Sequence, residues 1–253
     1  MLRSVLVSSA LGLLLAGPAL ADPASGVNWT GPYVGVNLGY GGGAIGYPFS
    51  GTTDAAGTNP INGRYHLRSS GIVGGGQAGY SFEMPGGWIL GAEADIDGAG
   101  IRGSNGASSV DGMGNTISGG AHTEIDDLGT ARGRLGYALF DGRLAPYVTG
   151  GFAYGQVKSN NSLNCSACGA GATALSNLTT ASSTQTGWTV GGGADYALTR
   201  RLSLRVEYLY ASLGGMPVAS GGLYSTPGAD IYNASVDARA RTNLVRLGLN
   251  YRF

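Results

Sequence analysis

The stretch Val245-Arg246-Leu247-Gly248-Leu249-Asn250-Tyr251-Arg252-Phe253 alternates strictly between apolar and polar residues and ends on an aromatic side chain. Successive side chains of a β-strand point to opposite faces, so one face here is apolar and the other is polar with two arginines. A strand of a water-soluble sandwich also alternates in this way. We interpret the stretch as a strand that closes a membrane barrel, with its apolar face in lipid.

Seven earlier segments repeat the alternation. Their apolar faces comprise Val34, Val36, Leu38 and Tyr40; Ile72, Ala78, Tyr80 and Phe82; Trp88, Leu90, Ala92, Ala94 and Ile96; Ala131, Gly133, Leu135, Tyr137 and Leu139; Val148, Gly150, Phe152 and Tyr154; Trp188, Val190, Gly192, Ala194, Tyr196 and Leu198; and Leu204, Val206, Tyr208 and Tyr210. With the C-terminal segment they make eight strands, which predicts an all-β, eight-stranded antiparallel transmembrane barrel.

The opposite faces carry charges of both signs. They are Glu93, Asp95, Asp97, Arg132, Arg134, Asp195, Arg205, Glu207, Arg246 and Arg252. Buried charges are costly unless they are paired, so this balanced set predicts an ion-pair network inside a closed lumen. An alternative is a conduction path, because rings of charged side chains can select ions. Eight strands, however, enclose a space that side chains just fill, which favours a plugged lumen.

The connections between the segments alternate between short and long. Short links are expected at 84–87, 140–143 and 199–201, and long loops at roughly 41–70, 98–124, 158–185 and 213–241. Outer-membrane barrels have short periplasmic turns and long outside loops. Aromatic residues also concentrate at both ends of the apolar segments, as in the interfacial girdles of a bilayer. A soluble lipocalin-like barrel would place its apolar face inside, and parity alone does not distinguish inside from outside.

The first 21 residues read as a cleaved signal peptide. Arg3 supplies a positive charge, Val5–Leu15 is apolar, and Ala19-Leu20-Ala21 resembles a cleavage site. The apolar part is shorter than the roughly 20 residues of a spanning helix. Residues 22–253 are then the barrel domain. The absence of net charge, with 12% charged residues, argues against nucleic-acid binding.

Four stretches resemble the small outer-membrane β-barrel surface proteins of Gram-negative bacteria, the outer-membrane immunogenic or "porin family" proteins. They are residues 29–40 (WTGPYVGVNLGY), 128–137 (LGTARGRLGY), 146–151 (PYVTGG) and 246–253 (RLGLNYRF). The resemblance implies localisation in the cell outer membrane and contact with outer-membrane lipid. It also implies that the terminal aromatic strand, with Tyr251 and Phe253, is recognised by the outer-membrane assembly machinery.

Two cysteines lie in the third predicted long loop, Cys165 and Cys168. In an exported protein such a pair favours a disulfide, whereas a zinc site needs about two more ligands. Gly74-Gly75-Gly76-Gln77-Ala78-Gly79 matches a dinucleotide-binding pattern, but it lies within an alternating strand and no helix follows it. No cofactor or metal is therefore predicted.

The histidines, His66 and His122, lie in the first and second predicted loops. They form no recognisable nucleophile arrangement with a serine. The sequence thus predicts a monomeric, non-enzymatic barrel with a structural and surface-interaction role. The leading alternative is a narrow channel for small solutes. Two weaker alternatives are a lipid-modifying enzyme that uses His66 or His122 and a haem-binding surface protein. The partner of the loops is not identified by any motif.

Overall fold

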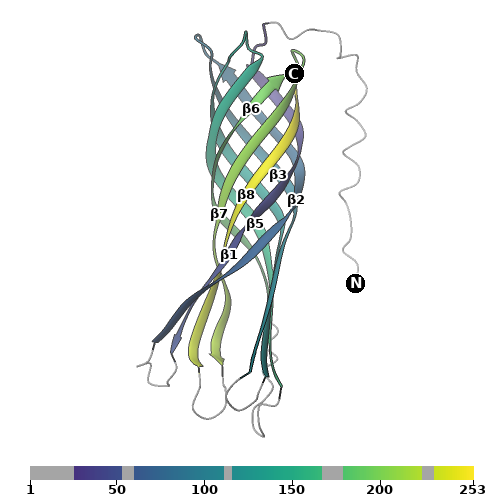
Figure 1. The fold of residues 1–253 in the computed structure, drawn as a ribbon. Helices are drawn as coiled ribbons and strands as arrows, with labels where there is room; N and C mark the ends of the chain where they lie inside the picture. Colours follow the sequence, from purple (N-terminus) through teal and green to yellow (C-terminus); the bar gives the residue numbers. More distant parts are fainter. Residues whose placement is uncertain (1–25, 53–59, 111–115, 167–178, 224–230) are drawn as a thin grey trace.

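Eight antiparallel strands close into one barrel (Figure 1). The computed structural model describes residues 26–52, 60–110, 116–166, 179–223 and 231–253. The strands are β1 (Gly31–Thr52), β2 (Pro60–Glu83), β3 (Trp88–Val110), β4 (Thr116–Tyr137), β5 (Leu144–Ser166), β6 (Thr179–Ala197), β7 (Leu202–Leu223) and β8 (Ile231–Arg252). Each strand pairs with the next one in the sequence, and β8 pairs back with β1. The predicted fold class is confirmed.

The apolar face of the strands points outward. Leu38, Ile72 and Ile96 are 64%, 66% and 67% exposed, whereas Asp97 and Glu207 on the opposite face are 0% and 1% exposed. A soluble barrel would show the reverse arrangement. An apolar surface that encircles the barrel is compatible with lipid rather than water around it.

Three tight connections join β2 to β3, β4 to β5 and β6 to β7. In the first, the Met84 amide donates to the Trp88 carbonyl at 2.7 Å, and Gly86 and Gly87 adopt φ of 94° and 85°. These backbone angles are strained for residues with a Cβ, which explains the Pro-Gly-Gly sequence there. The barrel end that carries these links is called the turn end below.

Aromatic residues line the outside of the turn end. Trp88 and Tyr137 meet edge to face, with ring centroids 5.3 Å apart, and Tyr251 and Phe253 do the same at 5.4 Å. At the other limit of the apolar belt, Trp188 and Tyr210 lie 5.4 Å apart. The two levels match the expected interfacial girdles.

The long loops were predicted too long. β1 continues to Thr52 and β2 starts at Pro60, so strand structure occupies most of the range 41–70, and the other three ranges are shortened similarly. The outward apolar alternation stops where the strands leave the lipid, and the prediction followed that face alone. The inward face continues to alternate, with Ile45, Leu67 and Ile101 buried.

Beyond the belt, the barrel wall separates into two sheets, as the lower part of Figure 1 shows. In the described residues, β2–β3 pairing ends at Ser70–Arg102 and β6–β7 pairing ends at Gly187–Leu213. β7, β8, β1 and β2 stay paired as one sheet, the first leaf, and β3 to β6 as another, the second leaf. Together the two leaves are called the extension. Among the described residues, no helix is long and apolar enough to cross a membrane.

Candidate functional site in the barrel lumen

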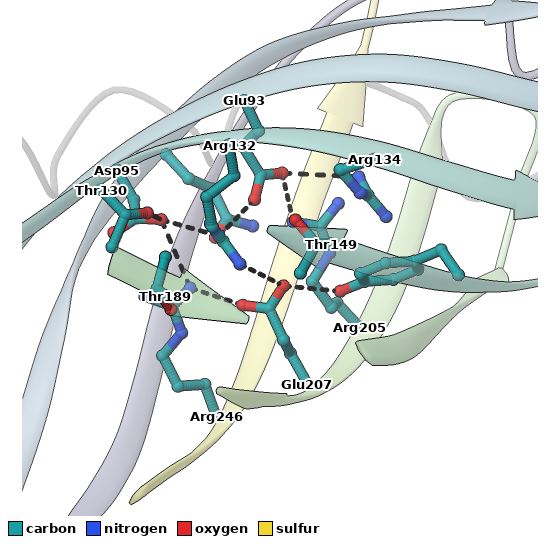
Figure 2. A network of polar contacts seen from close by, with 12 residues as sticks. Glu93, Asp95, Thr130, Arg132, Arg134, Thr149, Thr189, Arg205, Glu207 and Arg246 are labelled. Carbon is teal, nitrogen blue, oxygen red and sulfur yellow. Dashed lines mark hydrogen bonds and ion pairs between the residues drawn. The ribbon is translucent and has the colours of Figure 1, made fainter. Parts of the chain in front are cut away.

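The structure brings nine of the ten predicted inward-facing charged residues, all but Arg252, into one buried cluster. Each side chain is at most 8% exposed, although β3, β4, β6, β7 and β8 all contribute to it. Closure of the barrel places these strands around a single axis, and the shared parity turns every charged position toward it. Figure 2 shows the resulting network.

Arg132 of β4 lies at the centre of the network. Its Nη2 contacts Glu93 Oε1 at 2.6 Å and Asp95 Oδ2 at 2.7 Å, and its Nη1 contacts Glu207 Oε1 at 3.0 Å. Glu93 is its direct cross-strand neighbour on β3, whereas Glu207 comes from β7. One guanidinium therefore links three carboxylates, which its planar array of donors permits.

Arg246 of β8 joins the carboxylates on the side toward the extension. Its Nη1 donates to Asp97 Oδ2 at 2.5 Å, and its Nη2 donates to Glu207 Oε2 at 2.5 Å and lies 3.3 Å from Asp95 Oδ2. Asp97 also accepts a hydrogen bond from Asn37 Nδ2 at 2.9 Å. The interaction fastens β8 to β3 across the lumen.

Arg205 and Arg134 form the level toward the turn end. Arg205 Nε donates to Asp195 Oδ1 at 2.7 Å, and Arg134 Nη2 contacts Asp195 Oδ2 at 2.8 Å. Both guanidinium groups also pair with Glu93. Two tyrosines complete this level: Tyr33 Oη donates to Glu93 at 2.6 Å, and the Arg134 guanidinium lies 3.7 Å from the Tyr147 ring centroid.

The network contains five carboxylates and four guanidinium groups, and Arg252 supplies a fifth cation nearby. Arg252 lies at the turn end, with its guanidinium 4.6 Å from the Trp29 ring centroid and its Nη1 3.4 Å from the Asn28 carbonyl oxygen. Opposite charges are thus matched within the lumen, which limits the cost of burying them.

Apolar side chains close the lumen on both sides of the charged level, which the sequence analysis missed. Toward the extension, a buried cluster is formed by Ile45, Leu67, Val73, Ala99, Ile101, Ile125, Leu128, Ala153, Val157, Leu209, Leu213, Ala240 and Leu244. At the turn end, Val27, Trp29, Ile89, Ala145 and Ala197 pack together. The alternation could have predicted part of this packing, because Leu209 and Leu244 lie two residues from Glu207 and Arg246 and share their inward face.

The glycine-rich match at residues 74–79 lies inside β2 and serves close packing. A Cβ on Gly75 would lie 2.0 Å from the Ile96 carbonyl oxygen, and one on Gly79 would lie 2.5 Å from the Tyr33 hydroxyl. Glycine is therefore needed at these positions to let neighbouring groups approach the β2 backbone. Nothing in this geometry corresponds to the strand-to-helix turn of a dinucleotide site.

The remaining candidate residues do not gather with the lumen cluster. His66 and His122 lie on β2 and β4, with β3 between them, and both point away from the buried face. The described residues contain no group of three or more His, Cys, Asp or Glu side chains that could hold a metal ion. Of the predicted disulfide pair, Cys165 lies near the end of β5, whereas Cys168 falls outside the described part of the chain, as does the predicted signal peptide of residues 1–21.

The chain resembles known proteins along nearly its whole length. Residues 8–253 match the family model described as outer membrane protein beta-barrel domain. The chain is 38% identical to a 31 kDa outer-membrane immunogenic protein of Brucella melitensis over 235 residues, which cover 92% of this chain and 87% of that protein. It is 28% identical to a 25 kDa outer-membrane immunogenic protein of Brucella canis, covering 93% and 84%.

The fold also shows a limited similarity to solved structures. The attachment invasion locus protein Ail of Yersinia pestis aligns with a TM-score of 0.37 and 13% identity, over 88% of this chain and 99% of that one. From the family match and the immunogenic relatives, the chain belongs to the outer membrane protein beta-barrel family and is a protein of the bacterial outer membrane.

Proposed function

We propose that this protein is a non-conducting, non-enzymatic surface barrel that contributes to the integrity of the outer membrane and presents its extension to the surroundings. The observation that carries the proposal is the filled lumen. The short-turn end faces the periplasm in this family of folds, so the extension faces the cell exterior.

The charged level supports a closed barrel because its carboxylates and guanidinium groups form ion pairs with one another. Arg132 alone contacts three carboxylates, and its side chain is 0% exposed. An ion that entered this level would have to replace charge-assisted hydrogen bonds with weaker contacts. A selective pore instead offers binding that is weak enough to release the ion.

The two apolar levels support the same conclusion independently. Leu209, Leu244 and Ile101 are 0% exposed inside the wall toward the extension, and Trp29 is 2% exposed at the turn end. The Trp29 indole Nε1 donates to the Gly142 carbonyl oxygen at 2.9 Å, which holds the ring in place. These apolar side chains offer a hydrated solute no hydrogen bonds in exchange for its water, so both levels add to the barrier formed by the charged level.

Single-channel recording in planar bilayers tests the proposal. Purified protein, shown to be folded by a heat-dependent shift in gel mobility, is expected to give no stable and reproducible conductance. Reproducible unitary steps from the folded band would refute the closed-barrel proposal and favour the narrow channel. The enzymatic alternative predicts altered lipid A in cells that express the protein; a change that His66→Ala or His122→Ala abolished would establish it.

A further inference from the structure

The outward surface of the first leaf carries a group of basic side chains just beyond the apolar belt. Arg241 of β8 and Arg68 of β2 both pair with Ala44 of β1, and Arg239 and His66 both pair with Gly46. All four basic residues are exposed, while the residues between them on each strand are buried. These four, His66, Arg68, Arg239 and Arg241, are called the basic patch below.

The basic patch lies at the height of lipid headgroups. Among the described side chains of β8, Val245 is the outward apolar residue nearest the extension, and Arg241 lies four residues beyond it. Four residues span about 13 Å along a strand, and roughly 10 Å along the membrane normal at a tilt of about 40°. The polar residue between them, Asn243, accepts a hydrogen bond from Tyr208 at 2.6 Å, which marks the interface. The basic side chains thus begin where phosphate groups of the outer leaflet are found.

Small residues on β1 leave room for a ligand between the arginines. Strands lie about 4.8 Å apart, so Arg68 and Arg241 have α-carbons roughly 10 Å apart across Ala44. Both side chains are long enough to reach one anion from opposite sides. At Gly46, an added Cβ would lie 3.6 Å from the His66 ring, so this imidazole borders the same surface.

The arginines of the patch have no acidic partner among the described side chains, in contrast with the second leaf. There Arg102, the cross-strand partner of Ser70, pairs with Glu124 at 2.5 Å, and Lys158 pairs with Asp126. Three neighbouring arginines repel one another, and no described carboxylate offsets this repulsion. An external anion bound among them would offset it.

We propose that the basic patch binds the phosphate groups of the phosphorylated lipid that forms the outer leaflet. The arginines donate hydrogen bonds to phosphate oxygens, the apolar belt below them contacts the acyl chains, and the site anchors one face of the barrel to the lipid. This assignment is independent of whether the lumen conducts, so each proposal can fail without the other.

The test is binding of purified bisphosphorylated lipid A to the full-length protein in phospholipid nanodiscs. The variant Arg68→Gln/Arg241→Gln is expected to weaken binding about 30-fold, the change that corresponds to about 1 kcal/mol for each of two arginines at an anionic lipid surface. The control Arg102→Gln removes an exposed positive charge beside Ser70, two residues from Arg68 along β2, where Glu124 already pairs with it, and is expected to leave affinity within about twofold. The heat-dependent gel shift verifies that each variant is folded.

Two further arms identify the ligand. Dephosphorylated lipid A is expected to bind wild type and the double variant equally, and inorganic phosphate is expected not to displace lipid A. Equal affinity of bisphosphorylated lipid A for wild type and the double variant would overturn the proposal. An equal loss in Arg102→Gln would also overturn it, because it would reduce the effect to net charge. Displacement by inorganic phosphate would overturn the assignment to lipid.

Discussion

Replacement of Arg132 by methionine is expected to destabilise the folded barrel by about 3–5 kcal/mol, the usual cost of leaving buried carboxylates without their partner. The side chain makes contacts of 2.6, 2.7 and 3.0 Å to Glu93, Asp95 and Glu207, and all four groups are essentially inaccessible. Methionine keeps most of the volume, so the loss reports on charge rather than on a cavity.

The three carboxylates keep different numbers of cationic partners in this variant. Glu207 keeps Arg246 at 2.5 Å, and Glu93 keeps Arg205 and Arg134. Asp95 retains only a 3.3 Å contact with Arg246 and the hydroxyl of Thr130 at 2.6 Å. Asp95 therefore carries most of the uncompensated charge.

The difference between Asp95 and the other carboxylates can be tested with a second substitution. Adding Asp95→Asn to Arg132→Met should restore more than 1 kcal/mol, whereas Asp195→Asn, which removes a carboxylate that Arg132 does not contact, should restore none. Urea unfolding in lipid vesicles, followed by tryptophan fluorescence, measures both differences. Arg102→Met, at an exposed ion pair, is the surface control and should cost less than about 1 kcal/mol. A loss below 1 kcal/mol for Arg132→Met, or equal restoration by both asparagine substitutions, would show that the network does not act as described.

Three other predictions concern packing, orientation and assembly. Gly75→Val should lower the yield of heat-shifted folded protein sharply, because a Cβ there meets the Ile96 carbonyl oxygen at 2.0 Å, while Gly76→Ala, whose nearest atom is 3.8 Å away, should fold normally; equal yields would exclude backbone crowding. A membrane-impermeant maleimide should label Asn160→Cys in the extension on intact cells above the wild-type background, and Pro85→Cys at the turn end only after permeabilisation; the opposite pattern would invert the proposed orientation. Deletion of Phe253 should reduce the amount of protein that reaches the membrane more than it reduces the unfolding free energy of protein already folded; normal membrane levels would remove the proposed assembly role of this residue.

The residues that face the lumen can be predicted only in part from the alternation of the sequence. Glu93 and Asp95 identify the polar face of one strand, and Arg132 and Arg134 that of the next, because residues two positions apart share a face. The same rule extends to Leu209 and Leu244, but an apolar residue on the polar face is ambiguous until the bilayer boundary is known. The apolar level toward the extension was therefore missed, together with the strand residues of the extension itself.

Partner choice within the network is a separate matter. Glu93 and Arg132 are cross-strand neighbours and could be paired from register, but Arg246 and Asp97 come from β8 and β3, which are not adjacent in the barrel. Their contact depends on closure of the wall and on the diameter of the lumen.

The sequence by itself determined the strand number, the alternation, the short turns and the composition of the two faces, because these follow from a local period of two residues and from turn chemistry. Only the tertiary structure decided which face is inside, which carboxylate each arginine contacts, and where the first leaf separates from the second. Those properties depend on contacts between residues far apart in the chain, such as Arg246 with Asp97, and on the closure of β8 against β1. The C-terminal strand carries both kinds of information: its alternation is local, and its arginine acquires a role only when the barrel closes.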